Sequence, residues 1–209
     1  MDAFCSCKRL KQVVFAPGSR LERIGRGGFN CTGIERIAIP KEVGEIQEGT
    51  FEGCENLKEV VFEEGSKLET IGSSAFYGCR HLKIVDFPEG LKGIKYSSFS
   101  YCESLEHIRL PDGLERIGVD CFCYSGLEEV ILPASVREVG AQAFYGCEQL
   151  RSVWLNEGLE KLGAKETVDG EEYEGEVFYG NAIESVRVPS TLKRVEARTF
   201  SYCDRLASV

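Results

Sequence analysis

A short pattern of apolar and polar positions recurs along the whole chain. Each copy begins with Phe, continues to Leu or Ile five or six residues later and then to Val or Ile, as Phe99, Leu105 and Ile108 show. Apolar and polar positions then alternate, which is typical of a strand with one buried face. After a turn a second apolar pair follows, such as Leu114 and Ile117. The pattern therefore predicts two short arms in each copy, the first of them a strand.

Nine phenylalanines begin the copies, at successive spacings of 25, 22, 25, 23, 23, 22, 34 and 22 residues. One strand cannot bury its own face, whereas copies stacked about 4.8 Å apart form a parallel sheet over a continuous core. No stretch has a long 3.6-residue period, so we expect helices to be few or short. The sequence predicts a mainly β solenoid of about eight repeats of 22–25 residues, which forms a single domain over residues 1–209. Both ends fall within a repeat, as expected for an excerpt of a longer array.

The repeats differ in the length of the corner after Phe. Those that begin at Phe29, Phe122 and Phe178 need five residues rather than six to arrive at the next apolar position. The same three lack the Cys that the other six carry at the third position after Phe. We expect the cysteine to belong to a wider corner, and Gly33, Gly126 or Asn181 to help close a narrower one.

Composition and charge exclude several classes of partner. The chain is 43% hydrophobic and 28% charged, which is ordinary for a globular protein, and its net charge is −9. An acidic surface repels nucleic acid and anionic membranes, so neither is an expected partner. Neither a signal peptide nor a transmembrane segment is recognisable in the sequence, and no membrane insertion is expected.

Cysteine and histidine offer no catalytic or metal site. The cysteines of the six wider corners have no Cys-x-x-Cys spacing, and stacked copies would point their Cβ vectors in parallel, which disfavours a disulfide. We expect buried free thiols that act as small apolar side chains. His81 is expected at an exposed corner and His107 on the outer face of the sheet. No nucleophile elbow, phosphate loop or zinc-protease motif occurs, so no catalytic residue, metal or cofactor is predicted. The six cysteines are Cys7, Cys54, Cys79, Cys102, Cys147 and Cys203.

An acidic insertion of about eleven residues lies at about 164–176. Its carboxylates could hold Ca²⁺, but their spacing matches no EF-hand loop, and a solvated loop is the preferred interpretation. Inserted loops often carry recognition, so Tyr173 is predicted as a secondary contact.

The outward positions of the predicted strands suggest a partner site. The single tryptophan, Trp154, projects outward between Ile131 and Arg187, and tryptophan and arginine dominate binding hot spots. We predict that the C-terminal half of the sheet binds a partner. The alternative is that Trp154 packs across the rungs or under the inserted loop. The predicted contact residues are Trp154, Ile131, Arg109, Arg187, His107 and Glu129.

The repeated phrase Ala-Phe-x-x-Cys-x-x-Leu-x-x-Ile-x-Ile/Leu-Pro resembles the leucine-rich repeat of BspA-like bacterial surface antigens. Residues 75–82 (Ala-Phe-Tyr-Gly-Cys-Arg-His-Leu) match it, residues 143–150 repeat most of it, and the likeness covers essentially the whole chain. It implies a right-handed leucine-rich-repeat superhelix with a parallel sheet on its concave side. It also implies surface adhesion or protein recognition, a protein ligand from the host or the extracellular space, and a cell-surface or secreted location.

Together these observations predict a non-catalytic protein-protein recognition or adhesion module that binds its partner on the concave sheet. One alternative is a structural spacer arm that displays other domains of a longer surface protein, which would have a featureless concave face. Another is an enzyme that uses Cys79, Cys121 or Cys123, which would require a lowered thiol pKa.

Overall fold

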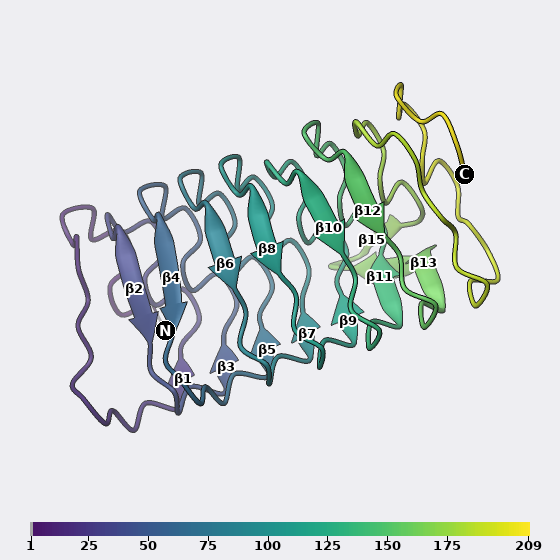
Figure 1. The fold of residues 1–209 in the computed structure, drawn as a ribbon. Coiled ribbons are helices and arrows are strands. Elements are labelled where there is room, and N and C mark those ends of the chain that lie inside the picture. The colour runs from purple at the N-terminus through teal and green to yellow at the C-terminus, as the bar shows by residue number, and fades with distance from the viewer. Residues whose placement is uncertain (1) are drawn as a thin grey trace.

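Each repeat forms one turn of a solenoid, with the two termini at opposite ends (Figure 1). The computed structural model describes residues 2–209, and this part of the chain contains no helix. First-arm strands pair in parallel and in register, for example Ile37 with Val60 and Val85 with Ile108. The first-arm strands are β2 (Arg36–Ile39), β4 (Glu59–Phe62), β6 (Ile84–Asp86), β8 (His107–Arg109), β10 (Glu129–Ile131) and β12 (Ser152–Trp154).

The second arm also forms a parallel sheet, and this sheet is the continuous one. Its seven strands follow one another in the order of the chain, and each buries one apolar side chain, such as Ile46, Ile71 or Ile94. The first-arm sheet instead divides into a four-stranded part, β2-β4-β6-β8, and the pair β10-β12. The second-arm strands are β1 (Arg23–Ile24), β3 (Glu45–Ile46), β5 (Thr70–Ile71), β7 (Gly93–Ile94), β9 (Arg116–Ile117), β11 (Glu138–Gly140) and β13 (Lys161–Ala164).

The predicted solenoid is confirmed, with fewer complete turns than the eight expected. Both arms form strands in six consecutive repeats, from β2 with β3 to β12 with β13. Beyond these, within residues 2–209, the first arm is continued only by the isolated parallel bridges Gln12↔Arg36, Ser152↔Ser185 and Ser185↔Ser208.

The phenylalanines that begin the repeats form one stacked column through the solenoid. From Phe4 to Phe200, consecutive ring centroids lie 4.9–5.5 Å apart with nearly parallel planes. The backbone on either side follows one conformation: in the repeat of Phe99, Ser97 (φ 52°) and Tyr101 (φ 58°) are left-handed. The amides of these three residues donate to carbonyls of the next repeat at 2.8–2.9 Å. The Phe corner is therefore a third hydrogen-bonded ladder, which accounts for the regularity of the phrase.

The corner cysteines are buried as predicted, with one exception. Five of the six lie in the core, and each of these thiols donates to the carbonyl oxygen of the preceding repeat's Phe at 3.0–3.2 Å. The prediction is wrong for Cys7, which is exposed, because no repeat precedes its corner in the structure.

Two of the three narrower corners require a glycine, which is Gly33 in one and Gly126 in the other. A Cβ on Gly33 would lie 2.2 Å from the carbonyl oxygen of Lys8, and one on Gly126 would lie 2.3 Å from that of Glu103. No side chain fits at these distances, so the shortened corner closes directly against the backbone of the preceding repeat. Asn181 takes the place of the cysteine in the third narrow repeat, where it is buried.

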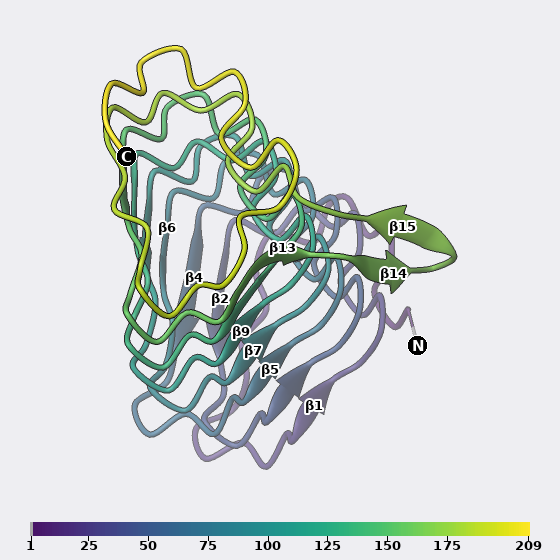
Figure 2. The same ribbon diagram turned by 90° about the vertical axis from the view of Figure 1, so that its right-hand side faces the viewer.

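The acidic insertion is largely exposed to solvent, as predicted, but it forms a β-hairpin rather than an irregular loop. Strands β14 (Glu166–Val168) and β15 (Glu171–Tyr173) pair antiparallel and leave the solenoid at the end of β13 (Figure 2). Both residues between them, Asp169 (φ 51°) and Gly170 (φ 89°), have the positive φ of a tight two-residue turn. The Asp-Gly pair is therefore the local signal for the hairpin.

Candidate recognition surface

Trp154 lies on the outer face of the first-arm sheet. Its side chain is 63% exposed, and its register partner Ile131 on β10 is 60% exposed. Their neighbours Val130 and Val153 are buried in the core, so the alternation of the strand turns residues 131 and 154 outward. The predicted orientation of Trp154 is confirmed, and the alternative that it packs under the insertion is wrong.

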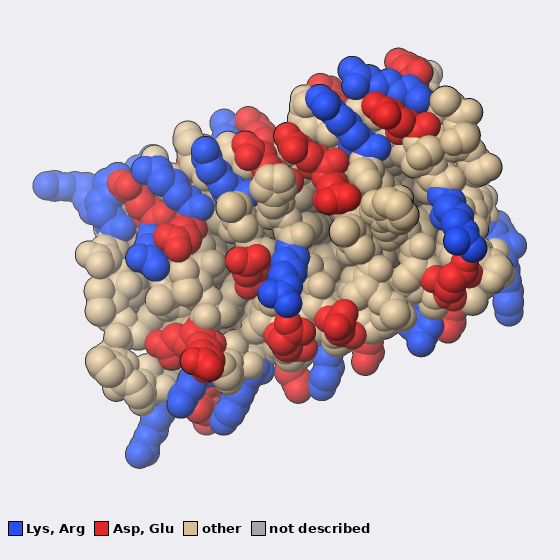
Figure 3. Space-filling model, viewed as in Figure 1, with Lys and Arg blue, Asp and Glu red and all other residues tan. Residues whose placement is uncertain are grey.

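Small side chains lie next to the indole. Its Nε1 donates to the hydroxyl of Ser152 at 3.0 Å, and Ser152 forms a bridge with Ser185 in the next repeat. On the first-arm face, charged residues are most frequent along the upper and lower edges, and an acidic and a basic side chain lie side by side near the centre, between uncharged areas (Figure 3). An exposed aromatic side chain with hydroxyl neighbours is suited to bind a partner.

Two clefts flank the β10-β12 pair, and the six predicted contact residues line them. The first, about 530 Å³, lies between β12 and the following repeat and includes Trp154 and Arg187. The second, about 280 Å³, lies between β8 and β10 and is lined by residues that include His107, Arg109, Glu129 and Ile131. The structure thus divides the predicted site into two adjacent depressions separated by one pair of strands.

The clefts on the first-arm face lie beside the three repeats with short corners. The repeats with narrow corners contribute the strand β10 and the first-arm segments around Arg36 and Ser185. At each of these, pairing with the preceding repeat is reduced to an isolated bridge or absent. A third first-arm cleft, about 540 Å³, lies at the remaining narrow repeat, between residues 11–15 and 35–38. Reduced pairing is not confined to short corners, because the repeat of Phe200, which has a wider corner, also pairs only through the bridge Ser185↔Ser208.

An exposed ion pair borders each cleft. Arg187 lies 3.2 Å from Glu157, and the guanidinium side chain is 87% exposed. Glu157 also accepts hydrogen bonds from the hydroxyl and the amide of Ser190 at 2.8 and 2.9 Å. The Ser190 hydroxyl is the main cause of the lowered pKa of Glu157, and Arg187 adds to it. In the second cleft Arg109 lies 3.3 Å from Glu89. Such exposed pairs are weak, so a partner's carboxylate can replace the acid at low cost.

Comparison with known proteins identifies the family. A family profile described as the BspA type leucine rich repeat region matches in six copies, over residues 1–79, 65–166 and 171–209. The chain belongs to the BspA-type leucine-rich-repeat family. A search of curated proteins gives no match.

Solved bacterial leucine-rich-repeat proteins share this fold. A protein from Bacteroides ovatus is 28% identical with a TM-score of 0.69, over 83% of this chain and 44% of its own length. The T. pallidum leucine-rich repeat protein is 29% identical with a TM-score of 0.67, over 95% of this chain and 88% of its own. A protein from Faecalibacterium prausnitzii described as a leucine rich cell surface protein is 23% identical, with a TM-score of 0.50 over 84% of this chain and 56% of its own. This chain therefore spans less than half of the Bacteroides ovatus protein.

Tyr173 lies on the opposite arm from Trp154. Its hydroxyl is 3.1 Å from that of Tyr96, which follows β7, and Glu166 of the hairpin is 2.6 Å from Arg116 on β9. These contacts tie the hairpin of this BspA-type solenoid to its second-arm sheet. The ring is only partly exposed, and its hydroxyl already has a partner within the chain.

The buried thiols have the wrong electrostatics for catalysis. Burial raises the pKa of Cys79, Cys121 and Cys123, whereas a nucleophilic cysteine needs a lowered pKa. Over residues 2–209 no group of three or more His, Cys, Asp or Glu side chains is placed to hold a metal ion. The same residues include no helix of the length and apolarity needed to cross a bilayer.

A second exposed surface was missed by the sequence analysis. Six tyrosines from consecutive repeats form a column outside the Phe corner, with neighbouring ring centroids 4.8–5.6 Å apart. The available signal was a tyrosine at the first or second position after each Phe from the fourth repeat onward. We call this column the tyrosine ridge; it consists of Tyr77, Tyr101, Tyr124, Tyr145, Tyr179 and Tyr202.

Proposed function

We propose that this BspA-type domain is a non-catalytic recognition module that binds a protein partner on the outer face of its first-arm sheet, at a bacterial cell surface. The observation that carries the proposal is the exposed pair Ile131 and Trp154 between two clefts. A large aromatic side chain in a depression with arginine beside it is the usual composition of a binding hot spot. The described cell-surface character of the Faecalibacterium prausnitzii protein supports the location.

A spacer arm would need only rigidity, not this face. Exposed Trp154 and Ile131 contribute little to the core, and an arm without a ligand has no use for an apolar pair in the middle of a face. Recognition therefore accounts for a feature that a spacer leaves unexplained.

Binding to an extracellular protein fraction tests the proposal. The wild-type chain, Trp154→Ala and the control Ile84→Ala are immobilised, and binding is measured before and after the fraction is treated with protease. Ile84 is exposed on the same face, on β6, outside both clefts, which makes Ile84→Ala the matched control. We expect protease-sensitive binding that falls at least tenfold in Trp154→Ala only. Equal binding by wild type and Trp154→Ala, with both variants folded, would contradict the proposal.

A photo-crosslinking residue at position 131 gives a direct readout of the face. A crosslinked protein recovered with the probe at Ile131, but not with the same probe at Val14, would place the partner at the C-terminal clefts. The opposite pattern would assign binding to the N-terminal end of the sheet.

A further inference from the structure

Charge is distributed unevenly along the solenoid. Residues 1–41 contain eight Lys or Arg and three Asp or Glu, a net charge of +5, whereas residues 42–209 carry −14. Basic side chains extend from the end of the molecule that carries the first repeats, above and below the first-arm sheet (Figure 3). This end therefore attracts acidic groups, although the average surface of the chain repels them.

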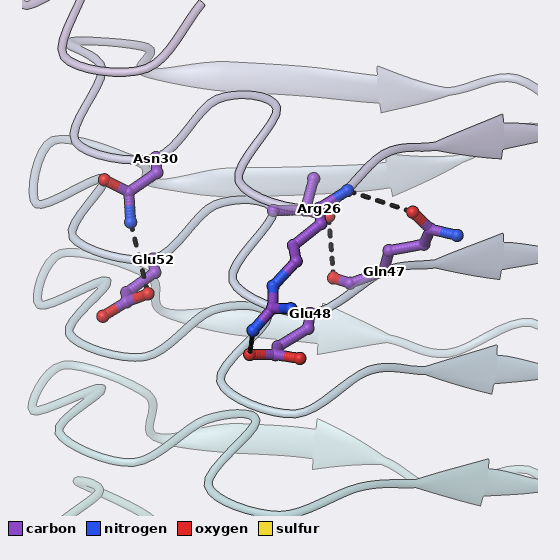
Figure 4. A network of polar contacts seen from close by, with 6 residues as sticks. Arg26, Asn30, Gln47, Glu48 and Glu52 are labelled. Atoms are coloured by element: carbon purple, nitrogen blue, oxygen red, sulfur yellow. Dashed lines mark hydrogen bonds and ion pairs between the residues drawn. The ribbon is translucent and has the colours of Figure 1, made fainter. Parts of the chain in front are cut away.

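Most cations at this end have no acidic partner. Arg26 is held by its neighbours: its guanidinium contacts Glu48, and its amide donates to the side chain of Gln47 at 3.0 Å (Figure 4). Five other cations are exposed and form no ion pair within residues 2–209, so they are available to a partner. We call them the free cations; they are Lys8, Arg9, Arg20, Arg23 and Lys41.

The free cations border the third cleft of the first-arm face. This cleft, about 540 Å³, includes Val14, which is 77% exposed. Lys8 and Arg9 directly precede its first segment, and Arg20 follows the turn after that segment. A partly apolar depression with cations at both ends is complementary to an acidic segment.

The complementary segment is present on the same molecule, in the hairpin β14-β15. The inserted segment holds six acids and one lysine. Glu166 and Glu172 pair with cations of their own chain. Asp169, Glu171 and Glu174 are exposed and form no ion pair in the described part of the chain. Because the hairpin projects from the solenoid, these three carboxylates can approach another molecule (Figure 2).

The two regions of opposite charge cannot meet within one chain. The hairpin is tied to the second-arm sheet by the contacts of Glu166 with Arg116 and of Tyr173 with Tyr96. The free cations belong to the first two repeats, and the hairpin follows β13 near the other end of the stack (Figure 1). Free carboxylates and free cations can therefore combine only between different copies.

We propose that the hairpin of one copy docks on the third cleft of another, so that copies of this chain associate head to tail. The three free carboxylates pair with the free cations that border the cleft. The two surfaces lie on different parts of each molecule, so the contact is heterologous and produces an open chain or a ring, not a symmetric dimer. Exposed charge pairs are individually weak, so the association is weak and reversible.

Sedimentation velocity of the full chain over a range of concentrations tests the association. Salt at about 0.01 M leaves a Debye length of about 30 Å, and about 1 M shortens it to about 3 Å. We expect association at low salt that is at least tenfold weaker at high salt. Trp154→Ala should associate as wild type does, which separates this result from the test of the proposed function. No association at low salt, or association that salt does not weaken, would overturn the proposal.

Two charge-neutral variants locate the contact. Glu171→Gln/Glu174→Gln removes free carboxylates of the hairpin, and Lys8→Gln/Arg9→Gln removes free cations beside the cleft. Each should associate at least fivefold more weakly than wild type. A mixture of the two should form dimers, because one intact hairpin and one intact cleft remain. Wild-type association by both variants would overturn the proposal.

Control variants make the same changes of charge at exposed, unpaired positions elsewhere in the described chain. They are Glu148→Gln/Glu160→Gln and Lys83→Gln/Lys193→Gln. Both should associate as wild type does. Equal weakening in the control variants and in the variants of the hairpin and the cleft would show that only net charge matters, which would overturn the proposed contact.

Zero-length crosslinking gives a readout on the wild-type chain without any substitution. A carbodiimide joins a lysine amine to a carboxylate in contact with it as an amide, with loss of water. In a mixture of isotopically labelled and unlabelled chain, we expect mixed-label crosslinks between Lys8 of one copy and Glu171 or Glu174 of another. Mixed-label crosslinks confined to other surfaces would overturn the proposal.

Discussion

The hydroxyl groups of Tyr96 and Tyr173 lie 3.1 Å apart, although 77 residues separate them in the chain. Tyr96 follows β7, and Tyr173 ends a hairpin inserted after β13, so this contact joins repeats that are not neighbours in the stack. A second tie, of 2.6 Å, joins Glu166 to Arg116. In a solenoid, repeats otherwise contact only their neighbours. The insertion therefore acts as a brace along the second-arm sheet.

Removal of one hydroxyl should loosen this brace. Tyr173→Phe loses the hydrogen bond to Tyr96 but keeps the ring. We therefore expect the free energy of unfolding to fall by about 0.5–1.5 kcal/mol and the amides of β14 and β15 to exchange faster. Hydrogen exchange followed by mass spectrometry measures it. Tyr202→Phe, on an exposed ring elsewhere, should leave the hairpin unchanged, and equal exchange in Tyr173→Phe would contradict the brace.

Alanine substitutions in the phenylalanine column should destabilise the protein most in the middle of the column. Phe99 is fully buried between two stacked rings, and Phe99→Ala should cost about 3–5 kcal/mol by loss of apolar burial and formation of a cavity. Phe4 is 47% exposed at one end of the column, so Phe4→Ala should cost clearly less. Urea denaturation compares the two variants. Similar losses would argue against the column as one continuous core.

The narrow corner at Gly126 should not accept a side chain. A Cβ there would lie 2.3 Å from the carbonyl oxygen of Glu103, so we expect Gly126→Ala to destabilise the fold by about 1–3 kcal/mol through overpacking. Gly93→Ala is the control, because its Cβ would meet no atom within 4 Å. Melting temperatures of both variants test this, and an unchanged value for Gly126→Ala would contradict the close approach.

Thiol reactivity should separate the cysteines by burial. Cys5, Cys7 and Cys31 are exposed and the other seven cysteines are buried. Burial also raises the pKa of Cys147 to about 11, which slows its reaction further. We expect three thiols to react quickly with a colorimetric disulfide reagent in the folded protein and all ten after denaturation. A fast reaction of Cys147 without unfolding, identified by mass spectrometry, would contradict the described core.

The contribution of Asp120 to stability should increase as the pH falls from about 7 towards 4. The carboxyl group of Asp120 is largely buried, and its Oδ1 has no hydrogen-bond partner within residues 2–209. Burial, with a smaller contribution from Glu176, raises its pKa from 3.8 to about 6. Because the folded pKa lies above the unfolded one, the penalty is fully present above about pH 6 and is lost as the pH falls through this range.

The variant Asp120→Asn isolates this effect from other titrating groups. Allowing for partial solvent screening, the free energy of unfolding of wild type should rise by about 1–2 kcal/mol more than that of the variant between pH 7 and pH 4. Chemical denaturation at both pH values measures the difference. If the free energy of unfolding depended on pH identically in wild type and variant, ionisation of Asp120 would cost the folded chain no stability.

The sequence determined the solenoid, the strands of the first arm and the outward position of Trp154. Nine copies of one phrase repeat every local preference, and stacking is the one arrangement that buries the same apolar set in each. Strand alternation then fixes which residues face outward, without knowledge of the rest of the chain. The short corners at Gly33 and Gly126 were also predictable from the sequence, because the loss of one residue is clear in a regular repeat.

Only the tertiary structure determined the contacts between repeats. The clefts beside the short-corner repeats are formed by side chains of two adjacent repeats, so no single repeat predicts them. Tyr96 meets Tyr173 because the hairpin folds back across several rungs. The tyrosine ridge and the pKa of Asp120 also depend on side chains from different repeats lying side by side. Local pattern specifies each turn, whereas contacts between turns arise only when the stack exists.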